Sequence, residues 1–257
     1  MVTTLLTVVG VIFAFVTGLF VLSVIVKRND IADIAWGFGI FLVGLTSYVV
    51  SEAPTALALV LLALGALWGL RLTLRILLRN IKKSEDARYK KWRDQWGVWF
   101  YPRSYLQVYL LQGSLMVVVG YPFVHASVYG GVFEPSLLII LGIAVWCVGY
   151  FFEVVGDYQL DTFLNNKDNR GKIMNTGLWK YSRHPNYFGE VSMWWGIWLI
   201  VLTMPLGYIA VISPLMITYL ILKVSGIPML EKSFDDNPDF QEYKKRTSAF
   251  FPLPRKN

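Results

Sequence analysis

Long apolar runs are the feature of this sequence that most constrains its fold. A helix needs about 20 apolar residues to cross the hydrocarbon core of a bilayer. Stretches of roughly that length cover residues 2–26, 34–50, 54–78, 106–126, 136–157, 187–204 and 206–224. Hydrophobic residues make up 55% of the chain and charged residues 16%, whereas soluble domains average about 45–50% and about 25%. We therefore predict an all-α, polytopic transmembrane bundle of about seven helices.

The basic residues test this topology independently. All 24 Lys and Arg lie near the end of, or after, the first, third, fifth or seventh apolar stretch, and the connections around Ser51, Tyr129 and Pro205 carry none. Lys and Arg accumulate in cytoplasmic loops, so the pattern predicts an external N-terminus and a cytoplasmic C-terminus. We expect residues 1–257 to form a single multi-pass membrane domain. It would lie in the inner membrane of a prokaryotic cell or the endoplasmic reticulum of a eukaryotic one.

The net charge of +7 then lies on one face of the membrane. Topology and attraction to anionic membrane lipids account for most of these cations, so we expect no nucleic-acid partner and see no sign of an obligate protein partner. The long polar stretches, residues 80–104 and 159–183, and the tail from residue 225 share this face. Loops of such length are commonly functional, and we expect a functional site to open to the cytoplasm.

Two stripes of like charge lie where lipid should be. They comprise Arg71, Arg75 and Arg79 at the inner end of the third apolar stretch, and Glu153, Asp157 and Asp161 at the inner end of the fifth. Like charges four residues apart on a helix repel each other, so each stripe needs a partner. One interpretation is that the stripes pair across the bundle. The other is that the arginines meet ligand phosphates while the carboxylates accept hydrogen bonds from ribose or amide groups. We expect no metal site.

Asp33 stands alone near the start of the second apolar stretch. Its spacing fits a helix cap, with Trp36 as an anchor at the membrane interface. It also fits a carboxyl group desolvated enough to stay protonated and donate a hydrogen bond.

The densest polar cluster is GLWKYSRHPNYFGEVSMWWG, residues 177–196. Pro185 suits the first turn of the sixth helix, which would place Asn186 and Glu190 on one helical face. Arg183 and His184 then crowd the positive helix start, a poor place for cations unless an anion joins them. The cluster therefore predicts a site for an anionic ligand.

At this point the sequence resembles a family. RHPNYFGE followed by WWG is similar to the carboxyl-terminal signature of the steroid 5-alpha-reductase superfamily, above all its poorly characterised microbial membrane branch. Related signatures occur in sterol delta-14 reductases, and a looser RHPxYxG occurs in isoprenylcysteine methyltransferases. The likeness extends to GDYQLDTF, NRG, NDIADIAWG and EDARY. It implies NADPH-dependent reduction of a carbon–carbon double bond conjugated to a carbonyl, in a steroid-like or other lipid substrate.

The resemblance also implies roles for individual residues. Asp33 would be catalytic and would polarise the substrate carbonyl. Apart from the resemblance, Tyr181 is a second catalytic candidate, since either it or water could return a proton to the α-carbon. Cofactor contacts would come from Asp157, Asn166, Arg170, Lys172, Asn186, Glu190 and Lys223, and the helix-start argument adds Arg183 and His184. Trp36, Trp68 and Trp194 would contact the substrate. We thus expect the cofactor site mainly within residues 153–257 and the substrate cavity mainly within residues 30–115. Two positions depart from the family pattern, because Trp68 replaces a tyrosine and Glu153 replaces an asparagine.

Two other functions compete with this one. An S-adenosylmethionine-dependent methyltransferase acting on a lipid or prenyl-cysteine carboxylate would share RHPxY and the membrane bundle. A small transporter or lipid-binding protein would explain the charged stripes but leaves the cluster from Arg183 to Glu190 without a purpose. No GxGxxG follows a strand and no GxxxxGK[ST] is present, so a dinucleotide would depend on the cytoplasmic cations.

Overall fold

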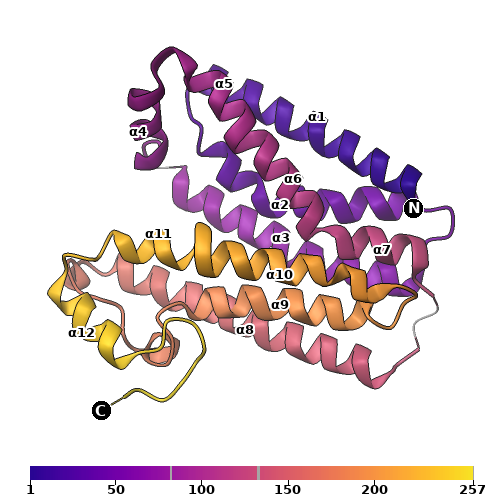
Figure 1. Cartoon of the computed structure of the whole chain (residues 1–257). Coiled ribbons are helices and arrows are strands. Elements are labelled where there is room, and N and C mark those ends of the chain that lie inside the picture. Colours follow the sequence, from indigo (N-terminus) through magenta and orange to yellow (C-terminus); the bar gives the residue numbers. More distant parts are fainter. Residues whose placement is uncertain (82, 132–133, 257) are drawn as a thin grey trace. The chain divides into compact units, whose positions relative to one another are not determined.

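The computed structural model of the chain describes residues 1–81, 83–131 and 134–256. These residues form helices and turns, and their one β-contact is an isolated bridge between Ser182 and Ser248. The prediction of an all-α fold is confirmed. The chain forms two compact units (Figure 1). The amino-terminal unit comprises Met1–Glu134 and Met204–Ala210, and the carboxyl-terminal unit comprises Pro135–Thr203 and Val211–Asn257.

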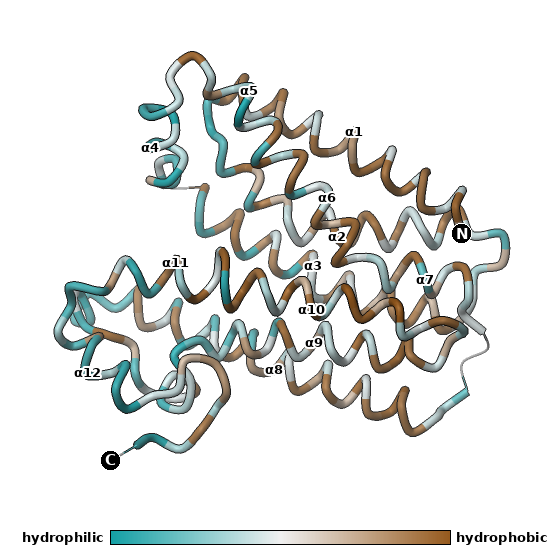
Figure 2. The backbone as a smooth tube through the Cα atoms, in the orientation of Figure 1, coloured by the Kyte–Doolittle hydropathy of each residue, from teal (hydrophilic) through white to brown (hydrophobic). Residues whose placement is uncertain are grey.

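The amino-terminal unit begins with three long apolar helices. They are α1 (Val2–Val26), α2 (Ile31–Val49) and α3 (Ala56–Asn80). The polar helix α4 (Ala87–Trp96) follows, and then a helical run through η1 (Gly97–Trp99), α5 (Phe100–Ser104), η2 (Tyr105–Leu110) and α6 (Leu111–Val119) to α7 (Tyr121–Tyr129). In Figure 2, α1 is largely hydrophobic whereas α4 is largely hydrophilic.

The fourth apolar stretch differs from the straight span predicted for residues 106–126. The helical run bends by 42° at the break before Tyr121. Gly120 lies at this break, where an added Cβ atom would come within 2.8 Å of Val43 Cγ1 and 2.9 Å of the Met116 carbonyl oxygen. The bend therefore depends on a residue without a side chain, which the apolar pattern alone does not reveal.

The carboxyl-terminal unit is built on α8 (Leu137–Asn165) and α9 (Pro185–Val201), which lie side by side (Figure 1). Short turns η3 (Lys167–Asn169) and η4 (Gly177–Lys180) connect them. The chain then continues through η5 (Gly207–Val211), α10 (Ile212–Tyr219), η6 (Leu220–Val224), α11 (Ile227–Lys232) and α12 (Pro238–Arg246).

Glycines repeated every seven residues bring α8 and α9 together. A Cβ atom on Gly149 would lie 2.6 Å from the Gly189 carbonyl oxygen, and one on Gly142 would lie 2.7 Å from that of Gly196. Small residues let membrane helices approach closely enough for backbone packing. About two turns further along α8, a Cβ atom on Gly156 would lie 3.3 Å from the Asn186 backbone nitrogen. The same glycine register therefore places the carboxylates of α8 beside the polar start of α9.

The protein is a multi-pass membrane protein. Among the described residues, five helical stretches are long and apolar enough to cross a membrane, or six if the bent run is one span. Helix α9 has 17 residues, or about 25 Å at 1.5 Å per residue. The number of seven spans, the orientation of the termini and the single-domain organisation stay predictions.

Candidate functional site

Asp33 lies inside the first turn of α2. The helix begins at Ile31, three residues earlier than the apolar pattern predicts, and Asp30 rather than Asp33 is its N-cap residue. The cap interpretation of Asp33 is therefore wrong. Asp30 instead pairs with Arg28 at 2.8 Å, which fixes the chain entering the helix.

Three hydrogen-bond donors converge on the Asp33 carboxylate. Arg88 Nη2 lies 2.7 Å from Oδ2, and the Tyr89 hydroxyl donates to Oδ1 across 2.9 Å. Gln112 Nε2 adds a longer contact of 3.4 Å to the same oxygen. We call these four residues the Asp33 cluster. In this arrangement the Asp33 carboxyl oxygens accept, and the Tyr89 hydroxyl is one of the donors.

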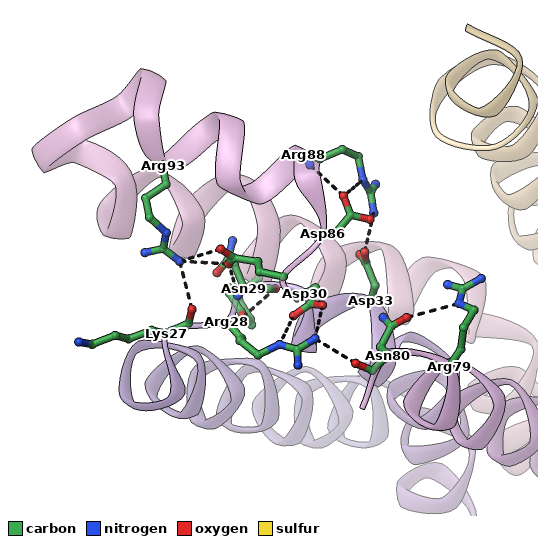
Figure 3. Close-up of polar contacts among 12 residues, drawn as sticks. Lys27, Arg28, Asn29, Asp30, Asp33, Arg79, Asn80, Asp86, Arg88 and Arg93 are labelled. Atoms are coloured by element: carbon green, nitrogen blue, oxygen red, sulfur yellow. Dashed lines mark hydrogen bonds and ion pairs between the residues drawn. The ribbon is translucent and has the colours of Figure 1, made fainter. Parts of the chain in front are cut away.

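A set of hydrogen bonds and ion pairs holds α4 against the start of α2 (Figure 3). The Glu85 carboxylate accepts a hydrogen bond from the Asn29 backbone at 2.8 Å and pairs with Arg93 at 3.0 Å. Asp86 accepts from the Arg88 backbone and guanidinium. Burial raises the pKa of Asp86, but these hydrogen bonds from Arg88 outweigh it, and the net pKa lies below its ordinary value. These contacts therefore position Arg88 and its neighbour Tyr89 toward Asp33.

A second carboxylate–amide pair lies in the carboxyl-terminal unit. Asn186, the second residue of α9, donates from Nδ2 to Asp157 Oδ1 on α8 across 3.1 Å. Asp157 is buried, with 3% of its surface exposed. The predicted helix start at Pro185 is confirmed, and it is this start that brings Asn186 to Asp157.

Both amides leave a buried oxygen without a hydrogen-bond partner in the described part of the chain. The atoms are Gln112 Oε1 and Asn186 Oδ1. Because a carboxylate only accepts, each amide must turn its nitrogen toward the acid, and this fixes which way the oxygen points. Buried acceptors of this kind are rare in proteins and call for an explanation. A ligand that donates a hydrogen bond to the oxygen at each position would explain both.

Arg183 and His184 contact an anionic side chain of the protein itself, the Glu231 carboxylate. Arg183 Nε lies 2.8 Å and His184 Nε2 lies 3.1 Å from the same oxygen of Glu231, and all three residues are buried. Arg183 also donates to the carbonyl oxygens of Lys244 and Thr247. The charge at this helix start is thus neutralised by a carboxylate from α11 rather than requiring a ligand, and these contacts give both residues a structural role.

The other predicted site residues differ in exposure. Asn166, Arg170, Lys172, Tyr181 and Lys223 are exposed, Glu190 and Trp36 are partly buried, and Trp68 and Trp194 are buried. Asn166 caps η3 by accepting from the Asp168 backbone. Lys172 lines a pocket of about 390 Å³ beside α12. The pairing of the two charged stripes stays a prediction.

Sequence reasoning missed the partners of Asp33 and of Arg183. Tyr89 lies in the motif EDARY, which was noted only as part of the family likeness, and its 2% exposure is unusual for a residue of a polar helix. Gln112 is a polar residue inside an apolar stretch, and such residues commonly face a site. Glu231 had no signal beyond its place in the tail.

These features define a membrane-embedded helical protein whose polar side chains gather at carboxylate–amide pairs. The chain belongs to the family described as Protein of unknown function (DUF1295), which matches residues 19–247. This family is in the steroid 5-alpha-reductase-like group.

Similarity to characterised proteins covers a shorter stretch. Over 72 residues the chain is 29% identical to 3-oxo-5-alpha-steroid 4-dehydrogenase 1 of Homo sapiens and of Macaca fascicularis. The match covers 28% of this chain, 28% of the human protein and 27% of the macaque protein. No solved structure matches the chain.

Proposed function

We infer that the protein is a membrane-embedded, NADPH-dependent reductase of a carbon–carbon double bond conjugated to a carbonyl, acting on a steroid-like or other lipid substrate. The observation that carries this proposal is the buried Asn186 oxygen, an acceptor without a partner beside Asp157, together with the donors gathered at Asp33. Similarity to 3-oxo-5-alpha-steroid 4-dehydrogenase 1, a protein named for a 3-oxo steroid, supports the substrate class. The signature RHPNYFGE supports the microbial branch of the superfamily.

The residues of the carboxyl-terminal unit fit a reduced nicotinamide cofactor. A carboxamide has two N–H donors, and the buried Asn186 Oδ1 is an acceptor in need of one. Asp157 and Glu190 would serve the ribose and amide groups. Asn166, Arg170, Lys172 and Lys223, which are exposed, would meet the phosphates. When bound, the cofactor would supply a hydride to the β-carbon of the substrate.

Arg183 and His184 support the site indirectly in this proposal. Their contacts with Glu231 anchor the chain just before α9, and so hold Asn186 in place at the start of that helix. Neither residue needs to touch the phosphates.

The Asp33 cluster would act on the substrate carbonyl. The Tyr89 hydroxyl would transfer its hydrogen bond from Asp33 Oδ1 to the carbonyl oxygen, while Arg88 and Gln112 continue to satisfy the carboxylate. A donor in a low-dielectric site stabilises the charge that develops on that oxygen. Asp33 is then a positioning residue, and Tyr89 takes the donor role that the sequence suggested for Asp33. A proton from water or from Tyr181 completes the addition at the α-carbon. Trp36, Trp68 and Trp194 remain proposed substrate contacts.

The cofactor assignment can be tested by ligand-dependent thermal stability. Detergent-solubilised protein is heated with NADPH, NADH or S-adenosylmethionine, and we expect NADPH to raise the melting temperature. Asn186→Leu should lose this shift, because the buried acceptor is gone. Ser192→Ala is the matched control on the same helix, since its hydroxyl bonds only to the Phe188 carbonyl oxygen among the contacts seen for it.

The outcomes separate the competing functions. A shift with S-adenosylmethionine alone would replace the proposal by the methyltransferase, and no shift with any of the three would remove an enzymatic role for Asn186. Where NADPH binds, its oxidation with a 3-oxo steroid carrying a 4,5 double bond, followed by absorbance, tests the reductase step itself.

A further inference from the structure

A basic pocket lies where the C-terminal tail folds over the segment before α9. It has a volume of about 430 Å³ and is lined by Lys180, Tyr181, Arg246, Pro254, Arg255 and Lys256. Four of these residues are cationic, and no acidic residue of the described chain is among those that line it. It is separate from the buried Asp157–Asn186 pair, whose residues do not line it.

The backbone of the tail holds this pocket in shape. The Leu253 amide donates to the Tyr181 carbonyl oxygen at 3.0 Å, and the Lys256 amide donates to that of Arg246 at 3.0 Å. The Arg183 amide reaches Ser248 at 2.8 Å. These hydrogen bonds fix the backbone that carries Arg255 and Lys256. A site formed in advance loses less conformational entropy when it binds an anion.

The charge within the pocket is only partly compensated. Arg246 pairs with Glu242 at 2.7 Å, and Arg255 also faces a neighbouring pocket lined by Asp239 and Glu242. Lys180 lies over the Tyr181 ring, 6.0 Å from its centroid. Guanidinium and ammonium groups gathered around one space are typical of phosphate recognition.

Exposed apolar side chains flank these cations. Phe251 is 62% exposed and Leu253 is 53% exposed, and both belong to the same tail. A phenylalanine and a leucine beside lysines and arginines are typical of a segment that rests in the interfacial region of a bilayer.

We propose that this pocket binds the phosphate of an anionic phospholipid headgroup, with Phe251 and Leu253 in contact with the acyl region. Lipid headgroups and soluble nucleotides share phosphate chemistry, and the exposed apolar residues favour the lipid. No residue of the Asp33 cluster or the Asp157–Asn186 pair takes part, and Tyr181, the proposed proton source, lines the pocket but is not replaced in the test below.

Native mass spectrometry of the full chain, released from nanodiscs, tests the proposal. The nanodiscs contain phosphatidylcholine alone or mixed with phosphatidylglycerol. We expect the wild type to retain phosphatidylglycerol in preference to phosphatidylcholine, and K180Q/R255Q/K256Q to reduce that retention at least about tenfold. The control K90Q/K91Q/K245Q removes the same charge from exposed positions outside the pocket and should retain the lipid.

Equal retention by the pocket variant and the wild type would overturn the proposal. So would a pocket variant that keeps phosphatidylglycerol but loses thermal stabilisation by NADPH or inorganic phosphate in phosphatidylcholine nanodiscs, since the pocket would then serve a soluble phosphate. Should the triple variant not fold, the single replacements R255Q and K256Q carry the same comparison.

Discussion

The Tyr89 hydroxyl lies 2.9 Å from Asp33 Oδ1 and joins the first turn of α4 to the first turn of α2. The two residues are 56 positions apart. Their contact places a buried phenol, a carboxylate and the Arg88 guanidinium at one point of the amino-terminal unit.

Replacing Tyr89 by phenylalanine should abolish most of the turnover. The change removes only the hydroxyl, so we expect a fall of about 100-fold, as for the loss of one preorganised donor, with NADPH stabilisation unchanged. NADPH oxidation and thermal shift measure the two effects. Tyr101→Phe, at a more exposed tyrosine, is the control and should be neutral.

Asp33→Asn tests the positioning role of Asp33. The amide cannot accept from Arg88 and Tyr89 as a carboxylate does, so turnover should fall while NADPH binding is spared. Full turnover in this variant would show that Asp33 does not position Tyr89.

Replacing Glu231 by glutamine should destabilise the carboxyl-terminal unit. Removing one partner leaves the buried Arg183 charge poorly compensated, which costs about 3–5 kcal/mol. Thermal or denaturant unfolding measures the loss. Glu242→Gln, whose side chain is 50% exposed, should cost less than about 1 kcal/mol. Equal effects of the two replacements would contradict a stabilising role for the buried Arg183–Glu231 ion pair.

The glycine contact between α8 and α9 predicts a strong size limit. Gly149→Ala adds a Cβ atom 2.6 Å from the Gly189 carbonyl oxygen, so the helices must separate, at a cost of about 1–3 kcal/mol. Gly10→Ala in α1 is the control, because an added Cβ atom meets nothing within 4 Å there. The melting temperature should fall only for Gly149→Ala.

Tyr243 on α12 predicts a loss of stability in alkali. Burial raises the pKa of its phenol above the ordinary value, and its hydroxyl donates to the Trp179 carbonyl oxygen. The contribution of a group with a raised folded-state pKa is full below the unfolded pKa and is lost as pH rises. Stability should therefore decline above about pH 10.

Measuring the melting temperature against pH checks this expectation. Tyr243→Phe should flatten the decline, at the cost of one hydrogen bond at neutral pH. Tyr208→Phe, at a tyrosine that is 61% exposed, should leave the decline as in the wild type. A wild-type curve that is flat above pH 10 would argue against a buried neutral phenol.

Local pattern was sufficient for much of the fold. The apolar run of residues 2–26 is α1 with the same bounds, and the proline of RHPN begins α9. Hydropathy and helix-start signals depend only on residues that are adjacent in the sequence, so they can be recognised without the tertiary structure. The bend at Gly120 was not predictable in this way, because it depends on contact with Val43 in another helix.

The sequence by itself determined that the chain is an all-α membrane protein with a polar cluster at the start of α9. Only the tertiary structure decided that Arg183 and His184 meet Glu231, 48 and 47 positions away, and that Tyr89 and Gln112 meet Asp33. The physical reason is that charge and hydropathy reveal which side chains need a partner. Which partner they obtain depends on how distant helices pack.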